Sequence, residues 1–127
     1  MGSEGNAKMT SPTQRSLKLL RDEGYLCAVV EKWNPHAKIR QDLFGVIDIL
    51  GIRAAGVIAV QTTSLSNIAS RIEKVETNPN LWLMLNAGWD VEVHGWAKKG
   101  AKGKRKLWEC KRVIIGNTAL THAGGIP

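Results

Sequence analysis

Two β-branched apolar runs lie near the middle of the chain, at residues 44–52 and 57–60. Short runs of this kind, bounded by small or polar residues, are typical of buried strands. Only the small residues Ala54-Ala55-Gly56 separate them, so we expect the two strands to pair as an antiparallel hairpin.

This hairpin carries a polar face inside an apolar sequence. With the turn centred on Ala54-Ala55, Asp48 lies opposite Gln61 and Val46 lies opposite Thr63. Because side chains alternate between the two faces of a strand, Asp48, Gln61 and Thr63 share one face. An aspartate within an apolar strand is costly unless it is paired or binds a metal, which makes Asp48 the first candidate for a functional residue.

Each of the three acidic residues of this region also has a structural interpretation that involves no functional site. Asp48 is alternatively a structural aspartate held by Thr62, Thr63 or Arg71. Asp42 falls on the same face as Asp48 if the strand is unbroken, and lies at the rim of the site; otherwise it is a solvated turn residue. Glu31 alternates onto a strand face and fits a surface position better than a site.

The remaining pattern predicts helices and strands on both sides of the hairpin. Ser11-Pro12 opens a helix that Gly24 ends, and polar residues separate the later segments. The expected segments are a strand at 25–33, a polar connection at 34–41, helices at 67–76 and about 80–87, and strands at 89–96 and 107–115. This order predicts an α/β domain over residues 11–115, in which helices flank a small mixed central sheet. Residues 1–10 and 116–127 are expected to be flexible tails.

Charge points to a polyanionic partner. The formal net charge is +7 and the sequence pI is about 9.7, which favours nucleic acid over an anionic membrane surface. The densest basic segment is a glycine-containing loop, and a solvated lysine-rich turn is its alternative interpretation. The candidate DNA-binding residues are Lys98, Lys99, Lys102, Lys104, Arg105 and Lys106, with His36 and Lys38 in the polar connection.

Several classes of protein are disfavoured. No apolar run approaches the ~20 residues of a membrane span, and neither zinc-ligand spacing nor a phosphate-binding glycine loop is present. Two cysteines without metal spacing, Cys27 and Cys110, fit a reducing cytoplasm. We therefore expect a cytoplasmic protein with no membrane partner.

The order of elements, with the segment Gly45-Val46-Ile47-Asp48-Ile49 and the strand 57–63, resembles the core of the PD-(D/E)XK nuclease superfamily. This restriction-endonuclease-like fold includes Holliday-junction resolvases, and the resemblance covers roughly residues 11–113. It implies that Asp48 binds a catalytic metal, Mg²⁺ or Mn²⁺, and that strand 57–63 ends in the family's acidic-x-Lys triplet.

Gln61 and Thr63 depart from that triplet, standing where the family has Glu or Asp and Lys. An amide oxygen can still ligate a hard cation, so the implied metal ligands are Asp48, Gln61 and Asp42. The missing cation would come from Arg71 or Lys74 in the following helix, with Lys38 behind them. Near the start of the first helix, Gln14 replaces the carboxylate that resolvases use there.

The resemblance implies a metal-dependent, structure-selective DNA endonuclease of the Holliday-junction-resolvase type, with Asp48, Gln61, Thr63, Arg71 and Lys74 as the catalytic set. Because a resolvase cuts two symmetric strands, a homodimer is expected, with the apolar helix at 81–85 as one interface. The alternatives are a catalytically inactive nucleic-acid-binding module on the same fold and a basic assembly protein without a nucleic-acid role. Metal binding that depends on Asp48 separates the first two, and DNA binding separates the third.

Overall fold

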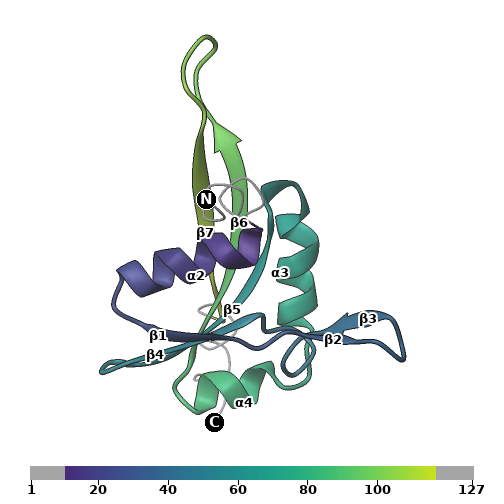
Figure 1. Cartoon of the computed structure of the whole chain (residues 1–127). Helices are drawn as coiled ribbons and strands as arrows, with labels where there is room; N and C mark the ends of the chain where they lie inside the picture. Colours follow the sequence, from purple (N-terminus) through teal and green to yellow (C-terminus); the bar gives the residue numbers. More distant parts are fainter. Residues whose placement is uncertain (1–10, 117–127) are drawn as a thin grey trace.

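The computed structural model describes residues 11–116 and shows a five-stranded mixed sheet with helices on both faces (Figure 1). The strand order is β1-β4-β5-β6-β7, and β2 and β3 form a separate two-stranded sheet. The α/β class is therefore confirmed, and the expected tails at 1–10 and 116–127 lie, except for Gly116, outside the described residues. The strands are β1 Leu26–Val29, β2 Lys32–Asn34, β3 Ile39–Gln41, β4 Ile49–Arg53, β5 Gly56–Ser64, β6 Asp90–Lys99 and β7 Leu107–Ile115.

Three helices and one short 3₁₀ turn complete the described part of the chain. They are α2 Pro12–Asp22, the 3₁₀ turn η1 Leu65–Asn67, α3 Ile68–Glu76 and α4 Leu81–Asn86. As the sequence predicts, Ser11 caps α2, its side chain accepting a hydrogen bond from the backbone of Gln14, and Pro12 follows at the first turn. None of these helices is long and apolar enough to cross a membrane.

The central hairpin has the predicted register over the part that is a strand. Ile49 pairs with Val60 and Arg53 with Gly56, around a turn at Ala54-Ala55. The expected strand at 44–52 is too long, however, because β4 begins only at Ile49.

A tight turn replaces the first half of that expected strand. Phe44 and Gly45 have positive φ angles of 54° and 84°, and the amide of Gly45 donates to the carbonyl of Asp42. The chain therefore reverses before Asp48, and the predicted pairing of Val46 with Thr63 does not form.

The connection from β5 to β6 places a helix beside the polar end of β5. The chain passes through η1, α3 and α4 and returns as β6, which runs parallel to β5 from Ile58↔Asp90 to Ser64↔Trp96. Helix α3 packs closely on β6 at Gly95, where a Cβ atom would lie 2.7 Å from Cδ1 of Ile68. Lacking a side chain, Gly95 sets the position of α3 over the sheet.

The two faces of the sheet carry separate cores. Helix α2 packs Leu17 and Leu20 against one face, whereas α3 and α4 bury Val75, Leu81 and Met84 against the other. The two layers hold the N-terminus of α2 and the middle of α3 on either side of the end of β5, where the polar residues lie.

The expected strand at 25–33 is wrong in one respect. It is interrupted after Val29, and the chain leaves the central sheet to form the β2–β3 hairpin. The polar connection at 34–41 is therefore mostly hairpin, closed by Asn34, whose side-chain oxygen accepts from the amides of His36 and Ala37. Such local bonding is typical of asparagine in turns.

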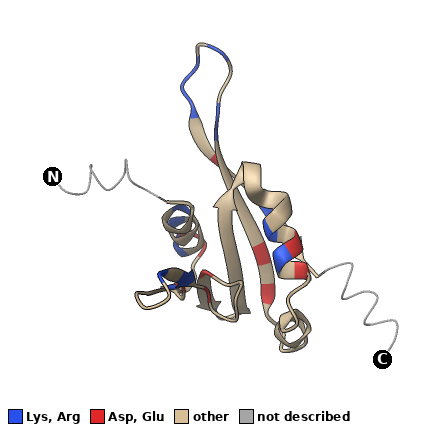
Figure 2. Ribbon diagram, turned by 90° about the vertical axis from the view of Figure 1, so that its right-hand side faces the viewer, with Lys and Arg blue, Asp and Glu red and all other residues tan. Residues whose placement is uncertain are grey.

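Strands β6 and β7 extend beyond the body as a long arm (Figure 1). Their pairing continues to Lys99↔Leu107, so the basic loop is shorter than the expected 97–106. Lys and Arg side chains are concentrated at its tip (Figure 2). At its base the guanidinium of Arg15 lies 3.4 Å from the ring centroid of Trp108, which links the arm to α2.

A buried polar chain fixes α2 to β6. The indole N–H of Trp96 donates to Oγ of Ser16 at 2.8 Å, and Ser16 lies 2.8 Å from Nδ1 of His94. Because the Glu92 carboxylate can only accept, Nε2 of His94 donates to it at 2.9 Å, which leaves Nδ1 to accept the hydroxyl hydrogen of Ser16. Burial alone would raise the pKa of Glu92, but hydrogen bonds from His94 and Arg112 outweigh it and hold that pKa below its usual range.

Replacement of Ser16 by alanine removes the central member of this chain. The variant leaves two buried polar groups of His94 and Trp96 without a partner, at a cost of about 1–3 kcal/mol each. We expect Ser16→Ala to lower the free energy of unfolding, measured in urea, by about 2–4 kcal/mol. Lys18→Ala, on the exposed side of the same helix, is the matched control and should change it little; equal effects would contradict the role of Ser16.

Candidate functional site

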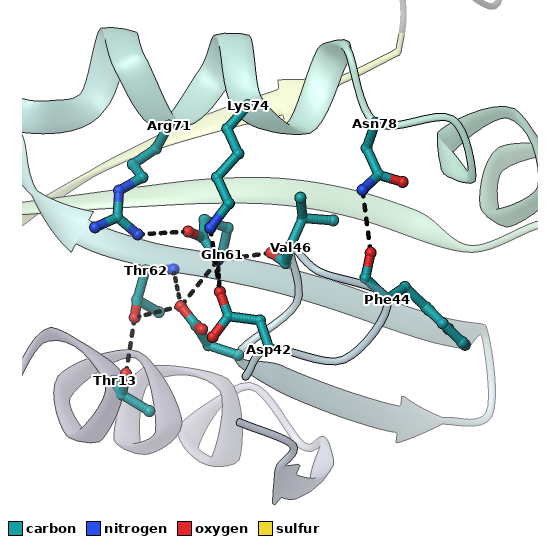
Figure 3. A network of polar contacts seen from close by, with 10 residues as sticks. Thr13, Asp42, Phe44, Val46, Gln61, Thr62, Arg71, Lys74 and Asn78 are labelled. Atoms are coloured by element: carbon teal, nitrogen blue, oxygen red, sulfur yellow. Dashed lines mark hydrogen bonds and ion pairs between the residues drawn. The ribbon is translucent and has the colours of Figure 1, made fainter. Parts of the chain in front are cut away.

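Asp48 lies at the centre of a buried polar network at the end of β5. Only 3% of the residue is exposed, and its Oδ2 accepts from the Thr62 amide at 2.8 Å and from the Thr62 hydroxyl at 3.1 Å. Since the Thr62 hydroxyl donates to Asp48, the hydroxyl of Thr13 donates to Thr62, at 2.8 Å (Figure 3). Helix α2 is thus bonded to Asp48 through two threonines.

Three carboxylates converge at this point. Glu31, Asp42 and Asp48 each place an oxygen within 4.8 Å of the others. Asp42 arrives through the turn that follows β3, not along an unbroken strand as expected. Glu31 comes from the junction of β1 and β2, with only 14% of its side chain exposed, so the expectation that it lies on the surface away from any site is wrong.

The pKa of Asp48 reflects this crowding. Burial raises it most, the backbone hydrogen bond from Thr62 lowers it, and the nearby charges of Asp42 and Glu31 raise it again, to about 8. Without a cation, this raised pKa favours the protonated form of Asp48 at neutral pH. A divalent cation among the three carboxylates would displace that proton.

Gln61 joins the carboxylates through its nitrogen. Its Nε2 donates to the carbonyl of Val46 at 2.6 Å, to Asp48 at 3.1 Å and to Asp42 at 3.4 Å, while its Oε1 accepts from Arg71 at 2.7 Å (Figure 3). In this orientation the oxygen expected to ligate a metal faces Arg71 instead. Gln61 positions the two aspartates, and Glu31 supplies the third acidic oxygen.

Helix α3 supplies positive charge to the same place. Arg71 bonds to Gln61, and Nζ of Lys74 lies 3.4 Å from Oδ2 of Asp42. Both candidates for the missing cation therefore reach the site, as expected from their common helix face. Thr63 is buried at the position where the family would have lysine, and carries no charge.

These groups line one cavity of about 600 Å³ between the start of α2 and α3. Three acidic and three basic side chains share it with several hydroxyl groups. The lining residues are Ser11, Pro12, Thr13, Glu31, Arg40, Asp42, Asp48, Thr62, Thr63, Ser64, Arg71 and Lys74.

Other residues singled out from the sequence lie outside the cavity. Gln14 is exposed on α2, and Thr13, its neighbour, makes the contact with the site. His36 and Lys38 are exposed on the β2–β3 turn. The six basic residues of the arm are exposed and do not line the cavity.

Sequence reasoning did not identify Thr13 and Arg40, and misplaced Glu31. Thr13 lies two residues after Ser11, the predicted start of α2. Its place in the first turn of this helix is the feature of the sequence that could have identified it. Arg40 forms an ion pair with Glu31 at 3.0 Å. Neither residue belongs to a periodic pattern, since both depend on how the β2–β3 excursion and α2 meet.

Comparisons with known proteins add no further assignment: no protein-family model, no curated protein and no solved structure matches this chain.

The raised pKa of Asp48 predicts an unusual pH dependence of stability. Because its proton is held up to about pH 8 in the folded state but only to about 4 when unfolded, the folded protein binds the extra proton between these values. Without divalent metal, the contribution of Asp48 to the free energy of unfolding therefore falls as pH rises through this window.

Asp48→Asn removes this contribution while keeping an oxygen for Thr62. In EDTA, we expect the difference in free energy of unfolding between variant and wild type to grow in favour of the variant from pH 5 to pH 8, as measured by urea denaturation. Asp22→Asn changes an exposed carboxylate of α2 and should show no such trend. A constant difference for Asp48→Asn across this range would contradict the assigned pKa.

Proposed function

We propose that this chain is a divalent-metal-dependent DNA endonuclease selective for DNA structure, similar in type to a Holliday-junction resolvase. The observation that carries the proposal is the convergence of Glu31, Asp42 and Asp48 in one cavity with Arg71 and Lys74. Carboxylates beside fixed cations fit a group that binds both a metal ion and a phosphate.

The donor set suits a hard divalent cation such as Mg²⁺ or Mn²⁺. All three acidic groups offer oxygen, the ligand that Mg²⁺ prefers. Among residues 11–116, every hydrogen bond to the Asp48 carboxylate falls on Oδ2, which leaves Oδ1 for a ligand. A bound cation would contact the scissile phosphate and lower the pKa of a bound water.

The surrounding residues have distinct roles in this proposal. Gln61, Thr62 and Thr13 hold the carboxylates in place through hydrogen bonds that carry no net charge. Arg71 offers guanidinium donors, and Lys74 a point charge, to the phosphate oxygens. Thr63 has no charged group to contribute, so α3 takes over the electrostatic function that the resemblance assigns to that strand position.

The order of elements supports this proposal in part. A hairpin, a polar end to its second strand and a helical crossover to a parallel strand follow one another as the resemblance implies, whereas Asp48 precedes β4 instead of lying within it and the β2–β3 hairpin is additional. The basic arm supports DNA as the polyanion, since its exposed lysines suit sequence-independent backbone contact.

A homodimer follows from this function, because two symmetric strands must be cut. Helix α4 is the proposed interface: it buries Leu81 and Met84 but exposes 61% of Trp82 and 54% of Leu83. An isologous contact would cover these two side chains in each subunit.

A second candidate is a nucleic-acid-binding module without catalysis. The specific observation in its favour is that Gln61 turns its nitrogen toward the carboxylates and Thr63 carries no charge, so both departures weaken the metal site that the resemblance implies. The arm would bind DNA in either case, so binding alone does not separate the two candidates.

Cleavage of labelled four-way-junction, forked and linear DNA tests the enzyme directly. In Mg²⁺ or Mn²⁺ we expect the wild type to cut branched DNA, and Asp48→Asn to lower the rate at least about 100-fold, by loss of a charged ligand. Glu31→Gln should lower it by at least about 10-fold, because Glu31 supplies the third acidic oxygen.

Glu73→Gln is the matched control for both variants, since it removes an exposed carboxylate of α3 outside the cavity. It should cut like the wild type. Salt-dependent DNA binding with no cutting by the wild type would favour the binding module, and cutting that persists in Asp48→Asn would overturn the proposed site.

The arm should govern affinity more than catalysis. Replacing Lys102, Lys104 and Arg105 together by alanine removes three exposed charges that lie outside the cavity. We expect weaker DNA binding with a shallower dependence on salt, by about 0.9 in the log–log slope for each lost phosphate contact to duplex DNA. Fluorescence anisotropy from 50 to 300 mM NaCl measures it; an unchanged slope would exclude the arm from the interface.

A further inference from the structure

The β2–β3 hairpin forms a second surface next to the cavity. It leaves the central sheet at Glu31 and returns at Asp42, so both of its ends are carboxylates of the site. Between them, residues 32–41 contain Lys32, Lys38 and Arg40 and no acidic residue. The hairpin is thus a basic projection attached at an acidic centre.

Trp33 lies on this hairpin with 55% of its surface exposed. It is paired directly with Arg40 across the two strands, so both side chains lie on the same face. Arg40 reaches Glu31 at 3.0 Å and lines the cavity. Trp33 is therefore on the side of the hairpin that leads into the site.

The other tryptophans of the chain are occupied or lie elsewhere. Trp96 is buried and bonded to Ser16, Trp108 is covered by Arg15, and Trp89 contacts the ring of Phe44. Within residues 11–116, Trp33 makes no aromatic or cation–π contact. Its indole therefore has a large apolar surface that is free to contact a ligand.

A hollow of about 300 Å³ lies alongside the indole. Besides Trp33, its lining comes from Pro35 and His36 of the turn and from Lys32, Asn34 and Gln41, which alternate onto the face of the hairpin opposite Trp33 and Arg40. These residues combine an aromatic ring with amide, imidazole and ammonium groups, a combination that suits stacking on a base and hydrogen bonding to its edge.

We propose that the β2–β3 hairpin binds an unstacked nucleotide beside the cut phosphodiester, with Trp33 stacking on the base and Arg40 contacting the adjoining phosphate. This inference rests on the proposed function and specifies its substrate: DNA with an unpaired base at or next to the cleavage point, as in a fork, flap or open junction. An intact duplex keeps its bases stacked and offers no partner to Trp33.

The distances along the chain fit this arrangement. Trp33 lies two positions after Glu31, with Lys32 between them, which is about 7 Å in an extended backbone. A DNA strand rises about 3.4 Å per nucleotide, so a phosphate at the carboxylates and a base at Trp33 would be one or two nucleotides apart. The basic hairpin and the phosphate backbone also have complementary charge.

The test compares binding of forked and fully paired DNA of the same sequence to the full chain in EDTA, by fluorescence anisotropy. Stacking is worth about 1–3 kcal/mol per base, so Trp33→Ala should weaken binding of the fork by roughly 10-fold and leave the duplex within about 2-fold. Trp33→Phe, which keeps an aromatic ring, should restore most of the affinity for the fork.

Ile52→Ala is the matched control, because Ile52 is comparably exposed (51%) but lies on β4 and lines neither the cavity nor the hollow. It should bind both DNAs as the wild type does. A fork that carries 2-aminopurine as its first unpaired base reports stacking directly through its fluorescence. Stacking on Trp33 should quench this fluorescence when the wild type binds, and Trp33→Ala should not quench it.

The outcomes separate this inference from the proposed nuclease. A wild type that cuts branched DNA while Trp33→Ala binds the fork and duplex unchanged would overturn the role of the hairpin alone. Trp33-dependent binding of the fork without cleavage would support the hairpin and reject the enzyme. Equal weakening of fork and duplex by Trp33→Ala, or failure of the wild type to bind either DNA, would reject base recognition.

Discussion

The carboxylate of Asp48 is the group on which the rest of the site depends. It is held almost completely away from water at the end of a buried strand, by the amide and hydroxyl of Thr62 and by Gln61. Each of these donors is itself fixed, since Thr13 bonds to Thr62 and Arg71 bonds to Gln61. One buried carboxyl group therefore connects α2, β5 and α3 through short hydrogen bonds.

Regular elements of this fold were predictable because their patterns are local. The β4–β5 register follows from the position of Ala54-Ala55, and α3 follows from apolar residues at helical spacing. The same reasoning placed Arg71 and Lys74 on one side of a helix, and the structure brings both to the cavity. In these cases periodicity alone determines which side chains face the sheet.

The acidic cluster was only partly predictable, because non-repetitive backbone forms it. Asp42 approaches Asp48 through a turn with positive φ at Phe44 and Gly45, whereas strand alternation gave the right neighbour for the wrong reason. Glu31 enters where the chain leaves the central sheet, a break that the apolar pattern of 25–33 does not reveal. The orientation of the Gln61 amide likewise depends on the hydrogen bond from Arg71. Arg71 belongs to α3, and the pairing pattern of the hairpin does not show that it lies next to Gln61.

Charge is distributed in opposite senses at the centre and the periphery. The acidic groups meet in the cavity, while the arm and the β2–β3 hairpin carry exposed basic residues away from it. This separation leaves the basic residues of the arm unpaired with the carboxylates of the cavity and available to the polyanion that we propose. Arg71, Lys74 and Arg40 are the cations at the boundary, and each contacts a group of the site.

The energetic cost of this centre bears on the choice between enzyme and binding module. Three carboxylates within 4.8 Å, one of them nearly buried, oppose each other and lower stability near neutral pH unless a proton or a cation is shared among them. Arg40 and Lys74 each pair with one of these carboxylates, Glu31 and Asp42, whereas Asp48 has no cationic partner among the described residues. A cation among the three carboxylates would relieve their repulsion, and for this reason the cluster supports the metal site that we propose.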